Sequence, residues 1–282
     1  MSLKSSMRTG KTRGAGISVL TLILLLVSLA VFPGAAYAKT KDASVGYASL
    51  AHSPTGNVHL SYNATTKTLT VTTTLIGLAP SSIHPAHIHE GNCQNPNDPV
   101  KYSLQNVVSD MTGQAKTTTI IKNVPDGIPA SGWLINVHNG PKLQPEDQYT
   151  PIACATILNT DAANEVSAPL GPTTSPNENA IGNSKLSVEG KVLTVTLNVS
   201  GLAPNSTHAA HIHAGDCNYT KQILYDLSPL QADSQGNATK TMSFNGVAGI
   251  PATGWDINIH YTTDLSTQTG FNPILCGNIT TS

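Results

Sequence analysis

His84-Pro85-Ala86-His87-Ile88-His89-Glu90-Gly91-Asn92-Cys93 is the stretch that decides the fold, because histidines and apolar residues alternate in its middle. Alternate side chains of a β-strand point to opposite faces, so His87 and His89 share one face and Ala86 and Ile88 share the other. A second copy, His208-Ala209-Ala210-His211-Ile212-His213-Ala214-Gly215-Asp216-Cys217, keeps the histidines, the glycine and the cysteine at the same spacing. We call these two stretches the histidine boxes, and they hold six of the ten histidines in the chain.

The sequence on either side of the boxes is also repeated, so that residues 45–158 align with about 164–280. The matched pairs outside the boxes are Gly77–Pro80 with Gly201–Pro204, Pro129–His138 with Pro251–His260, and Pro151–Cys154 with Pro273–Cys276. This tandem duplication predicts two domains, over 39–158 and 184–282. Residues 159–183 are rich in Asn, Ala, Pro, Ser and Thr, which is typical of a linker. An alternative for part of that segment is that Val166–Leu170 forms the first strand of the second domain.

Both copies carry the period-2 signal of β-strands. Lys67–Leu75 and Lys191–Val199 alternate β-branched and apolar residues and are bounded by Gly, Pro and Asn. No stretch of the chain after residue 38 sustains the 3.6-residue apolar period of a capped helix. Short strands and Gly- or Asp-containing turns over about 110 residues are typical of an antiparallel sandwich or a Greek-key barrel. We therefore predict an all-β protein with two tandem Greek-key β-sandwich or barrel domains.

Residues 1–38 have the three parts of a secretory signal peptide. A basic region precedes an apolar run over 17–32, and Ala36-Tyr37-Ala38 is a small-residue cleavage site. An uncleaved membrane anchor is the alternative, but the apolar run is shorter than the roughly 20 residues that span a bilayer. We expect cleavage, a secreted or cell-surface protein, and no stable membrane span in the mature chain.

Loss of the signal peptide would remove four of the 15 basic residues, namely Lys4, Arg8, Lys11 and Arg13, and none of the 16 acidic ones. The mature chain would then have 11 lysines against 16 acidic residues, a net charge of about −5, and no arginine. Binding to nucleic acid needs clustered Lys and Arg to neutralise phosphates, so we do not expect a nucleic-acid partner.

The four cysteines fall two to each copy, and an oxidising compartment favours disulfides. Four cysteines allow three pairings, of which the repeat favours Cys93 with Cys154 and Cys217 with Cys276. Each pair would close a loop of about 60 residues, which the chain-entropy model equates with a stabilisation on the order of 4 kcal/mol. The alternative is thiolate binding of a metal, although the cysteines lack the C-x-x-C spacing of such sites.

A third histidine in each copy can join the pair in the box. Trp133–His138 alternates so that Trp133 and His138 lie on opposite faces, and Trp255–His260 repeats the pattern. If neighbouring strands bring these residues together, the sets are His87, His89 and His138, and His211, His213 and His260. Three imidazoles suit copper or zinc. The alternative is that the outward-facing histidines meet solvent, but the recurrence of the whole arrangement favours a metal site. Outside these sets, we expect His52 and His59 to be ordinary surface or packing residues.

These residues give each copy a resemblance to copper/zinc superoxide dismutases. The similar features are Gly-Leu-x-Pro, His-x-x-His-x-His followed by Gly and Cys, a later strand that ends in His, and Cys276-Gly277-Asn278-Ile279. The resemblance implies a Greek-key barrel in which the two histidine sets are copper ligands and the cysteine pairs are disulfides. It also implies that His84 and His208 are structural histidines behind the site. The Ala-His-Ile-His run with a strand ending in Asn-Val-His or Asn-Ile-His is equally similar to the CHRD (chordin-type) domain, a secreted β module.

The chain departs from the dismutases in ways that bear on function. No histidine occurs between His89 and His138 or between His213 and His260, where the dismutases have further zinc ligands. The aspartate that binds zinc in the dismutases is matched by Asp226 in one copy but by Ser103 in the other. We therefore expect copper and no zinc. The dismutases have an arginine near the last cysteine that steers the anionic substrate, whereas this mature chain has none. Such steering raises association rates by roughly 10- to 1,000-fold.

The sequence therefore favours a secreted copper-binding protein with two superoxide-dismutase-like units, each with a three-histidine site and at most modest dismutase activity. One alternative is a non-enzymatic extracellular CHRD-type structural or interaction module. A second alternative is a copper-only superoxide dismutase. The predicted partner is a metal ion, and the sequence predicts no particular protein partner.

Overall fold

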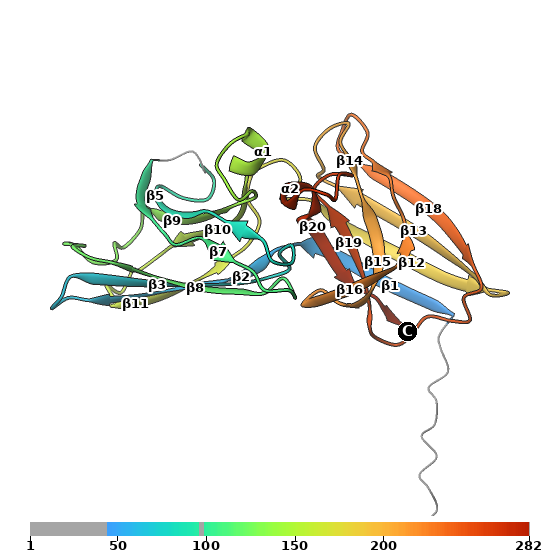
Figure 1. Cartoon of the computed structure of the whole chain (residues 1–282), viewed down its shortest axis with the longest axis horizontal. Helices are drawn as coiled ribbons and strands as arrows, with labels where there is room; N and C mark the ends of the chain where they lie inside the picture. The colour runs from blue at the N-terminus through green and yellow to red at the C-terminus, as the bar shows by residue number, and fades with distance from the viewer. Residues whose placement is uncertain (1–43, 96–98, 282) are drawn as a thin grey trace, which may run out of the picture. The chain divides into compact units, whose positions relative to one another are not determined.

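The structure is a computed structural model that describes residues 44–95 and 99–281. The predicted signal peptide at 1–38 lies outside the described residues. Nearly every element is a β-strand, and every strand pair among the described residues is antiparallel (Figure 1). The prediction of an all-β sandwich or barrel fold is confirmed.

The first β unit consists of two four-stranded sheets. One sheet has the order β11 (Glu165–Leu170), β2 (Thr55–Asn63), β3 (Thr68–Ile76) and β8 (Ala115–Ile121). The other has the order β10 (Pro151–Ile157), β9 (Trp133–His138), β5 (Ala86–Glu90) and β6 (Val100–Ser103). The short strands β4 (Ile83–His84) and β7 (Val107–Val108) pair with each other, and α1 (Glu146–Tyr149) precedes β10.

The second β unit is one nine-stranded sheet that curls around its own core. Its order is β16 (Tyr219–Asp226), β15 (Ala210–Asp216), β19 (Trp255–His260), β20 (Pro273–Asn278), β1 (Val45–His52), β12 (Ile181–Glu189), β13 (Val192–Ser200) and β18 (Ala238–Asn245). β21 (Thr280–Thr281) also pairs with β1. The short strands β14 (Thr207–His208) and β17 (Leu230–Gln231) pair with each other, and α2 (Gln268–Phe271) precedes β20.

The two repeats exchange their first strands. β1 begins the first repeat, yet it pairs with β12 over six residues and with β20 over two. In return, β11 pairs with β2 over six residues. Figure 1 shows the blue β1 among the orange and red strands of the second unit. The boundaries predicted at 158 and 183 follow the repeat along the sequence, whereas this strand pairing crosses them.

Side-chain packing follows the same exchange. Ala48 and Leu50 of β1 belong to the hydrophobic core of the second unit, together with Leu186 and Ile257. Val166, Ala168 and Leu170 of β11 belong to the core of the first unit. Because β1 and β11 each alternate buried and exposed residues, each can add a row of apolar side chains to the core of the other unit. The core of each unit is therefore completed by the other repeat.

The strand exchange predicts which strands a core mutation in β1 destabilises. Leu50 is 3% exposed, so Leu50→Ala is expected to reduce the free energy of unfolding by about 2–5 kcal/mol. Faster amide hydrogen exchange is expected in β12 and β20, and not in β2, although β2 follows β1 directly in sequence. The exposed Tyr47 on the same strand supplies the control Tyr47→Ala. Increased exchange in β2 and β3 alone would contradict the strand exchange.

Candidate metal centres

The first histidine cluster lies where β5 pairs with β9. His87 is opposite Asn136 in the register and His89 is opposite Leu134, while His138 ends β9 and its backbone N–H donates to the Pro85 carbonyl. His87 Nδ1 lies 3.3 Å from His138 Nε2. One nitrogen from each of His87, His89 and His138 lies within 4.8 Å of the others. The structure thus brings together the three histidines that the sequence singled out in the first copy.

The second cluster repeats this geometry where β15 pairs with β19. His211 is opposite Asn258 and His213 is opposite Asp256, while His260 ends β19. The ring centroid of His211 lies 5.5 Å from that of His213 and 5.3 Å from that of His260. The corresponding separations from His87 are 5.6 and 5.3 Å, so the two clusters have nearly the same shape.

Five of the six cluster histidines are buried and only His87 is partly exposed, which corrects the expectation that they all point outward. His211, His213 and His260 are 5%, 5% and 2% exposed. The short helices cover this face, because the His138 ring packs 5.0 Å from Tyr149 of α1 and the His260 ring packs 5.0 Å from Phe271 of α2. Strand alternation correctly separated the histidines from the apolar core but gave no sign of the covering helices.

Backbone carbonyls fix the orientation of several rings. His138 Nδ1–H donates to the carbonyl of Tyr149, and His260 Nδ1–H donates to the carbonyl of Phe271 at 2.6 Å. His213 Nδ1–H donates to the Lys221 carbonyl at 2.9 Å. A neutral imidazole with a proton on Nδ1 has its lone pair on Nε2. These hydrogen bonds therefore leave Nε2 of each ring as the atom able to bind a metal.

Each ring of the second cluster has one buried nitrogen without a hydrogen-bond partner. His211 Nδ1, His213 Nε2 and His260 Nε2 are buried and have no hydrogen-bond partner among the described residues. Buried polar atoms are nearly always satisfied, so three unsatisfied nitrogens within 4.8 Å of one another require an explanation. A metal ion that accepts all three lone pairs supplies one. The donor set fits the chemistry of copper or zinc, since both bind neutral imidazole.

The environment keeps these imidazoles neutral. Burial lowers the pKa of His138 and of His260 to about 4 in each case, and the neighbouring cluster histidines add to the effect. Burial is also the main cause of the lowered pKa of His87, His211 and His213. At neutral pH protons therefore compete weakly for the nitrogens of these five histidines.

His84 and His208 lie behind the clusters. His84 Nδ1–H donates to the His138 carbonyl at 2.8 Å, and His208 Nδ1–H donates to the His260 carbonyl at 2.9 Å. The opposite nitrogens lie 2.7 Å from the hydroxyls of Ser82 and Ser206, respectively. Both rings are fully buried. Each holds the backbone of the third cluster histidine and contributes no atom to the cluster itself.

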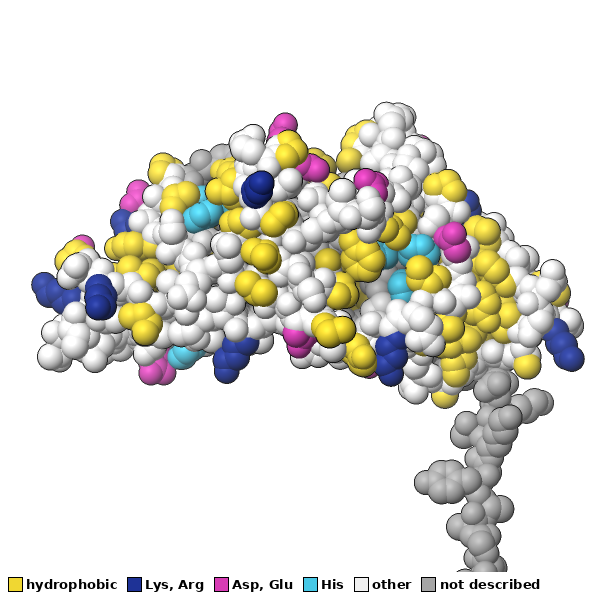
Figure 2. Space-filling view, viewed as in Figure 1, with side chains coloured by type: hydrophobic (Ala, Val, Ile, Leu, Met, Phe, Trp, Pro, Cys, Tyr) yellow, Lys and Arg dark blue, Asp and Glu magenta, His cyan; other side chains and the backbone are white. Residues whose placement is uncertain are grey.

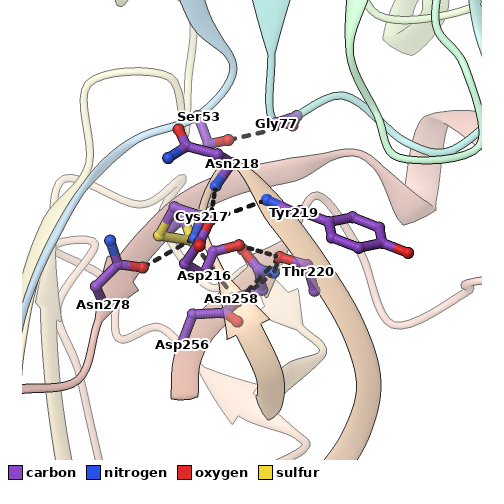
Figure 3. The surroundings of a disulfide bond; sticks show 11 residues. Ser53, Gly77, Asp216, Cys217, Asn218, Tyr219, Thr220, Asp256, Asn258 and Asn278 are labelled. Carbon is purple, nitrogen blue, oxygen red and sulfur yellow. Dashed lines mark hydrogen bonds between the residues drawn. A yellow bond between two sulfur atoms is a disulfide. The ribbon is translucent and has the colours of Figure 1, made fainter. Parts of the chain in front are cut away.

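Each histidine box is tied to the strand next to β9 or β19 by a disulfide. Cys93 is bonded to Cys154 and Cys217 to Cys276, and no cysteine is left free. The alternative of thiolate ligation is thus not what the structure shows. Figure 3 shows the second disulfide, where the Cys217 backbone N–H donates to Asn278 Oδ1 at 2.8 Å.

The glycine that follows the histidines in both boxes has a left-handed backbone conformation. Gly91 and Gly215 have φ values of +116° and +123°, which other residues rarely adopt. A Cβ atom at Gly215 would lie 2.3 Å from the Tyr219 carbonyl oxygen. Gly91 directly follows β5, and Gly215 lies in β15 next to a shift in its register with β16, so the repeated glycine has a structural reason.

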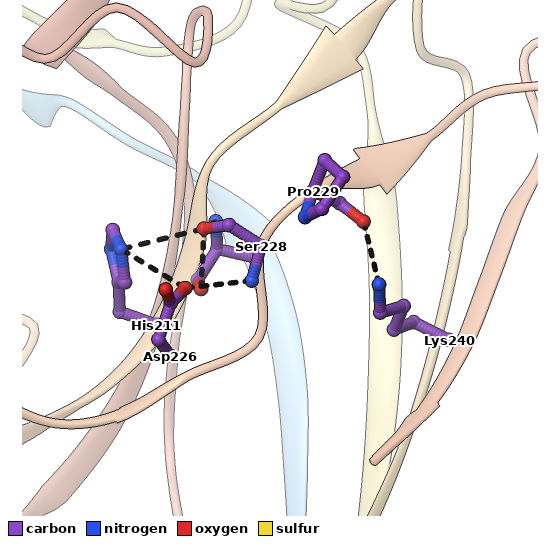
Figure 4. A network of polar contacts seen from close by, with 6 residues as sticks. His211, Asp226, Ser228, Pro229 and Lys240 are labelled. Carbon is purple, nitrogen blue, oxygen red and sulfur yellow. Dashed lines mark hydrogen bonds and ion pairs between the residues drawn. The ribbon is translucent and has the colours of Figure 1, made fainter.

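The two clusters differ in a carboxylate next to the first histidine. Asp226 Oδ1 lies 3.6 Å from His211 Nε2, and Ser228 Oγ lies 3.5 Å from the same nitrogen (Figure 4). In the first unit the register partner of His87 is Ser103. A carboxylate behind a metal-binding imidazole orients the ring and raises its basicity. The sequence placed Asp226 near the site, and the structure shows which histidine it faces.

A second difference is the buried acid Asp256, to which the sequence analysis assigned no role. Its Oδ2 accepts from Thr220 Oγ1 at 3.0 Å and from Asn258 Nδ2 at 3.1 Å, and lies 3.8 Å from Cys276 Sγ (Figure 3). Burial raises the pKa of this carboxyl to about 7. The first repeat has the apolar Leu134 at this position, and that difference between the copies was the available signal.

The other two histidines of the described chain lie outside both clusters. His59 is half-exposed and contacts Ser167 and Glu165. His52 is largely buried, with Nδ1 3.7 Å from Oε2 of the fully buried Glu178. Burial lowers the pKa of His52 to about 4 and raises that of Glu178 well above its usual value.

Comparison with known proteins gives a family match for part of the chain. Residues 158–265, which contain the second histidine box, match the CHRD domain. No curated protein matches the chain. Among 54 matching chains of solved structures, one is described as "Crystal Structure Analysis of the clock protein EA4". It shares 17% identity, the match covers 36% of this chain and 87% of that one, and the TM-score of 0.26 supports no argument. Within the described residues no helix has the length and apolarity needed to span a bilayer.

The Asp226 contact predicts a measurable difference between the clusters. Asp226→Ser is expected to lower the pKa of His211 further, because the nearby negative charge favours the protonated ring. Ser103→Asp should conversely raise the pKa of His87. Both can be followed by pH titration of imidazole NMR signals in metal-free protein, with the exposed Glu189→Gln as control. An unchanged His211 titration would show that Asp226 does not act on this ring.

Asp256 predicts a pH-dependent stability. Its folded pKa of about 7 lies above the value of about 3.8 expected when unfolded, so its contribution is favourable below pH 4 and is lost as pH rises to 7. At about 1.4 kcal/mol per pKa unit, the loss is at most about 4 kcal/mol. Asp256→Leu, which copies the first repeat, should remove this part of the pH dependence in chemical denaturation of metal-free protein. If the unfolding free energies of the two proteins changed in parallel from pH 4 to 8, Asp256 would not be the source of this pH dependence.

Proposed function

We propose that the chain is a secreted metal-binding protein in which each histidine cluster holds one copper ion. The observation that carries this proposal is the convergence of three buried, unsatisfied imidazole nitrogens in the second cluster. Two of these rings are already oriented by hydrogen bonds from their other nitrogen to backbone carbonyls. Such a preformed set of neutral donors reduces the cost of ordering ligands when a metal binds.

The donor set favours copper over zinc. Affinity for divalent ions at nitrogen sites is generally highest for copper, and imidazole is a suitable ligand for it. Within the described residues, no cysteine or carboxylate joins either group of three histidines. A bound copper ion would supply one-electron redox chemistry. The protein residues would hold it, exclude bulk water from it and keep the imidazoles neutral.

Any superoxide dismutase activity is expected to be modest. The similarity to copper/zinc dismutases in the histidine pattern suggests that reaction, but the mature chain has no arginine and a net charge near −5. Figure 2 shows lysine side chains scattered over the visible face rather than gathered together. A surface with this net charge and these scattered lysines does not attract an anionic substrate efficiently. A copper-only dismutase of high activity is accordingly the less favoured enzyme alternative.

A second candidate is a non-enzymatic extracellular CHRD-type structural or interaction module. The CHRD match over 158–265 favours it, and the two disulfides suit an oxidising, extracellular compartment. In this alternative the buried histidines would serve the fold, through hydrogen bonds to carbonyls, without a metal. Secretion is common to both candidates.

Copper stoichiometry separates the two candidates. The mature chain loaded with copper and freed of excess should hold about two ions, because each cluster offers one set of three nitrogens. His87→Ala and His211→Ala should each reduce the count to about one, and the double variant should reduce it to near zero. Metal content is measured by atomic emission, with His59→Ala as a control that lies outside both clusters.

If the protein binds no copper when copper is in excess, the copper proposal is rejected and the CHRD-type module is favoured. A superoxide assay on the loaded protein then tests the enzyme alternatives. A rate near the diffusion limit would mean that the missing arginine does not limit the reaction.

A further inference from the structure

A buried imidazole and a buried carboxyl group join the two segments through which the repeats exchange strands. His52 ends β1, and the crossover of residues 53–54 then leads into β2. Glu178 lies in the crossover of residues 171–180, between β11 and β12. His52 Nδ1 lies 3.7 Å from Glu178 Oε2, and the two side chains are 7% and 0% exposed. The pair therefore connects the two crossovers away from bulk water.

Hydrogen bonds hold both crossovers to the sheets. Ser53 donates through its backbone N–H to the Ile274 carbonyl of the second unit, at 3.1 Å. Its hydroxyl donates to the Gly77 carbonyl of the first unit, also at 3.1 Å. In the other crossover, the Thr173 hydroxyl donates to the Pro151 carbonyl of the first unit at 2.9 Å. The backbones that carry the pair are thus fixed, which keeps the imidazole and the carboxyl group together.

The surroundings of the pair supply no opposite charge. Neither nitrogen of His52 and neither carboxyl oxygen of Glu178 has a hydrogen-bond partner within the described residues. β20, which pairs with β1 at His52, carries no lysine, acid or histidine. The same is true of β10, whose Ile152 carbonyl faces the imidazole. Each member of the pair is therefore the only ionisable group available to neutralise the other from these strands.

The other groups around the pair are neutral or acidic. Those that face the pair, or face Tyr261 beside it, are the backbone carbonyls of Pro54, Ile152 and Glu178, the Tyr261 phenol, and Glu146 and Asp147 of α1. None of them can place a positive charge next to a buried carboxylate. An ionised Glu178 would thus depend on His52 for its counter-charge.

One proton shared between the two side chains makes the pair neutral. A protonated carboxyl beside a neutral imidazole has the same proton count as a carboxylate beside an imidazolium. A second proton would leave a net positive charge, and loss of the proton would leave a net negative charge, and each is costly in a buried site. Burial accordingly lowers the pKa of His52 to about 4 and raises the pKa of Glu178 well above its usual value.

We propose that the His52–Glu178 pair is a proton-dependent latch between the two crossovers. With one proton on the pair, the crossovers stay together. Without that proton, the buried carboxylate has no positive partner, so states in which Glu178 reaches water become more populated. These states separate the crossovers locally and leave the sheets paired. The latch involves neither histidine cluster, so the inference goes beyond the proposed function.

The direction of the pH effect follows from both groups. The pKa of Glu178 is raised on folding, so its contribution to stability is complete below the unfolded value of about 4.5 and is lost as pH rises. The pKa of His52 is lowered from 6.5 to about 4, so its contribution is complete above pH 6.5 and is lost as pH falls. The two effects cancel between about pH 4.5 and 6.5. The latch therefore weakens as pH rises above about 6.5, until the carboxyl group is ionised.

Amide hydrogen exchange of the metal-free mature chain tests the latch. Exchange is measured by mass spectrometry at pH 6 and pH 9, and each rate is divided by that of the unfolded chain at the same pH. Between these pH values, residues 171–180 should lose protection at least about 10-fold more than β3 and β13 do. Glu178→Gln, which keeps the side-chain shape but cannot ionise, should abolish this difference.

The exposed His59–Glu165 pair supplies the matched control. The same two residue types meet there at 3.8 Å, with side chains that are 45% and 69% exposed. Glu165→Gln should therefore leave the protection of residues 171–180 as in the wild type at both pH values. An equal loss of protection in the wild type and in Glu178→Gln would assign the effect to another group and overturn the latch. Unchanged protection of residues 171–180 in the wild type would overturn it even if Glu178→Gln did not fold.

Chemical denaturation of His52→Gln tests the other member of the pair. Relative to the wild type, its unfolding constant should rise by up to about 100-fold from pH 4.5 to 6.5, because one proton changes the constant about 10-fold per pH unit and the compensating effect of His52 is absent. A ratio of the two constants that does not change with pH would show that His52 does not share the proton, and the latch would be overturned.

Discussion

The antiparallel pairing of each histidine-box strand with a tryptophan-containing strand is the constraint on which both clusters depend. This pairing places two histidines of the box beside the histidine that ends β9 or β19. A shift of one residue in register would move the imidazoles to the core face and the apolar residues to the cluster face. The packing of Ile88 and Ile212 in the cores, with no exposed surface, therefore also fixes the histidine geometry. The fold and the candidate metal site are specified by the same alternating residues.

The two copies keep the cluster and vary its surroundings. Ring spacing, carbonyl hydrogen bonds, disulfides and the histidine behind the third ligand recur in both units. Asp226 and Asp256 appear in the second repeat where the first has Ser103 and Leu134. Asp226 places a negative charge beside His211, whereas Ser103 beside His87 is neutral. Duplication has thus produced two sites with a common donor set and different electrostatics.

Much of this arrangement could be predicted from local pattern. Alternation in Ala86–His89 and Trp133–His138 indicated strands with histidines opposite the apolar face, and the repeat indicated the disulfide partners. The burial of the histidines could not be predicted, because α1 and α2 are only four residues long and have no periodic signature. The partner of β1 was also not predictable, since alternation marks a strand as amphipathic without stating which sheet it joins. No role was predicted for Asp256, because its unusual environment comes from burial and the nearby disulfide, and only the replacement of Leu134 by an acid marked it in the sequence.

The strand exchange has a consequence for the order in which the chain can fold during synthesis. β1 leaves the ribosome first, but its partners β12 and β20 follow more than 120 residues later. The first unit has all its strands except β11 once β10 has emerged, and it completes its sheet only when residues 165–170 appear. Until then, β2 presents an unpaired edge, and exposed edges of this kind can pair with other chains. The nascent protein therefore carries two temporarily open strands, and export before folding would keep them away from the crowded site of translation.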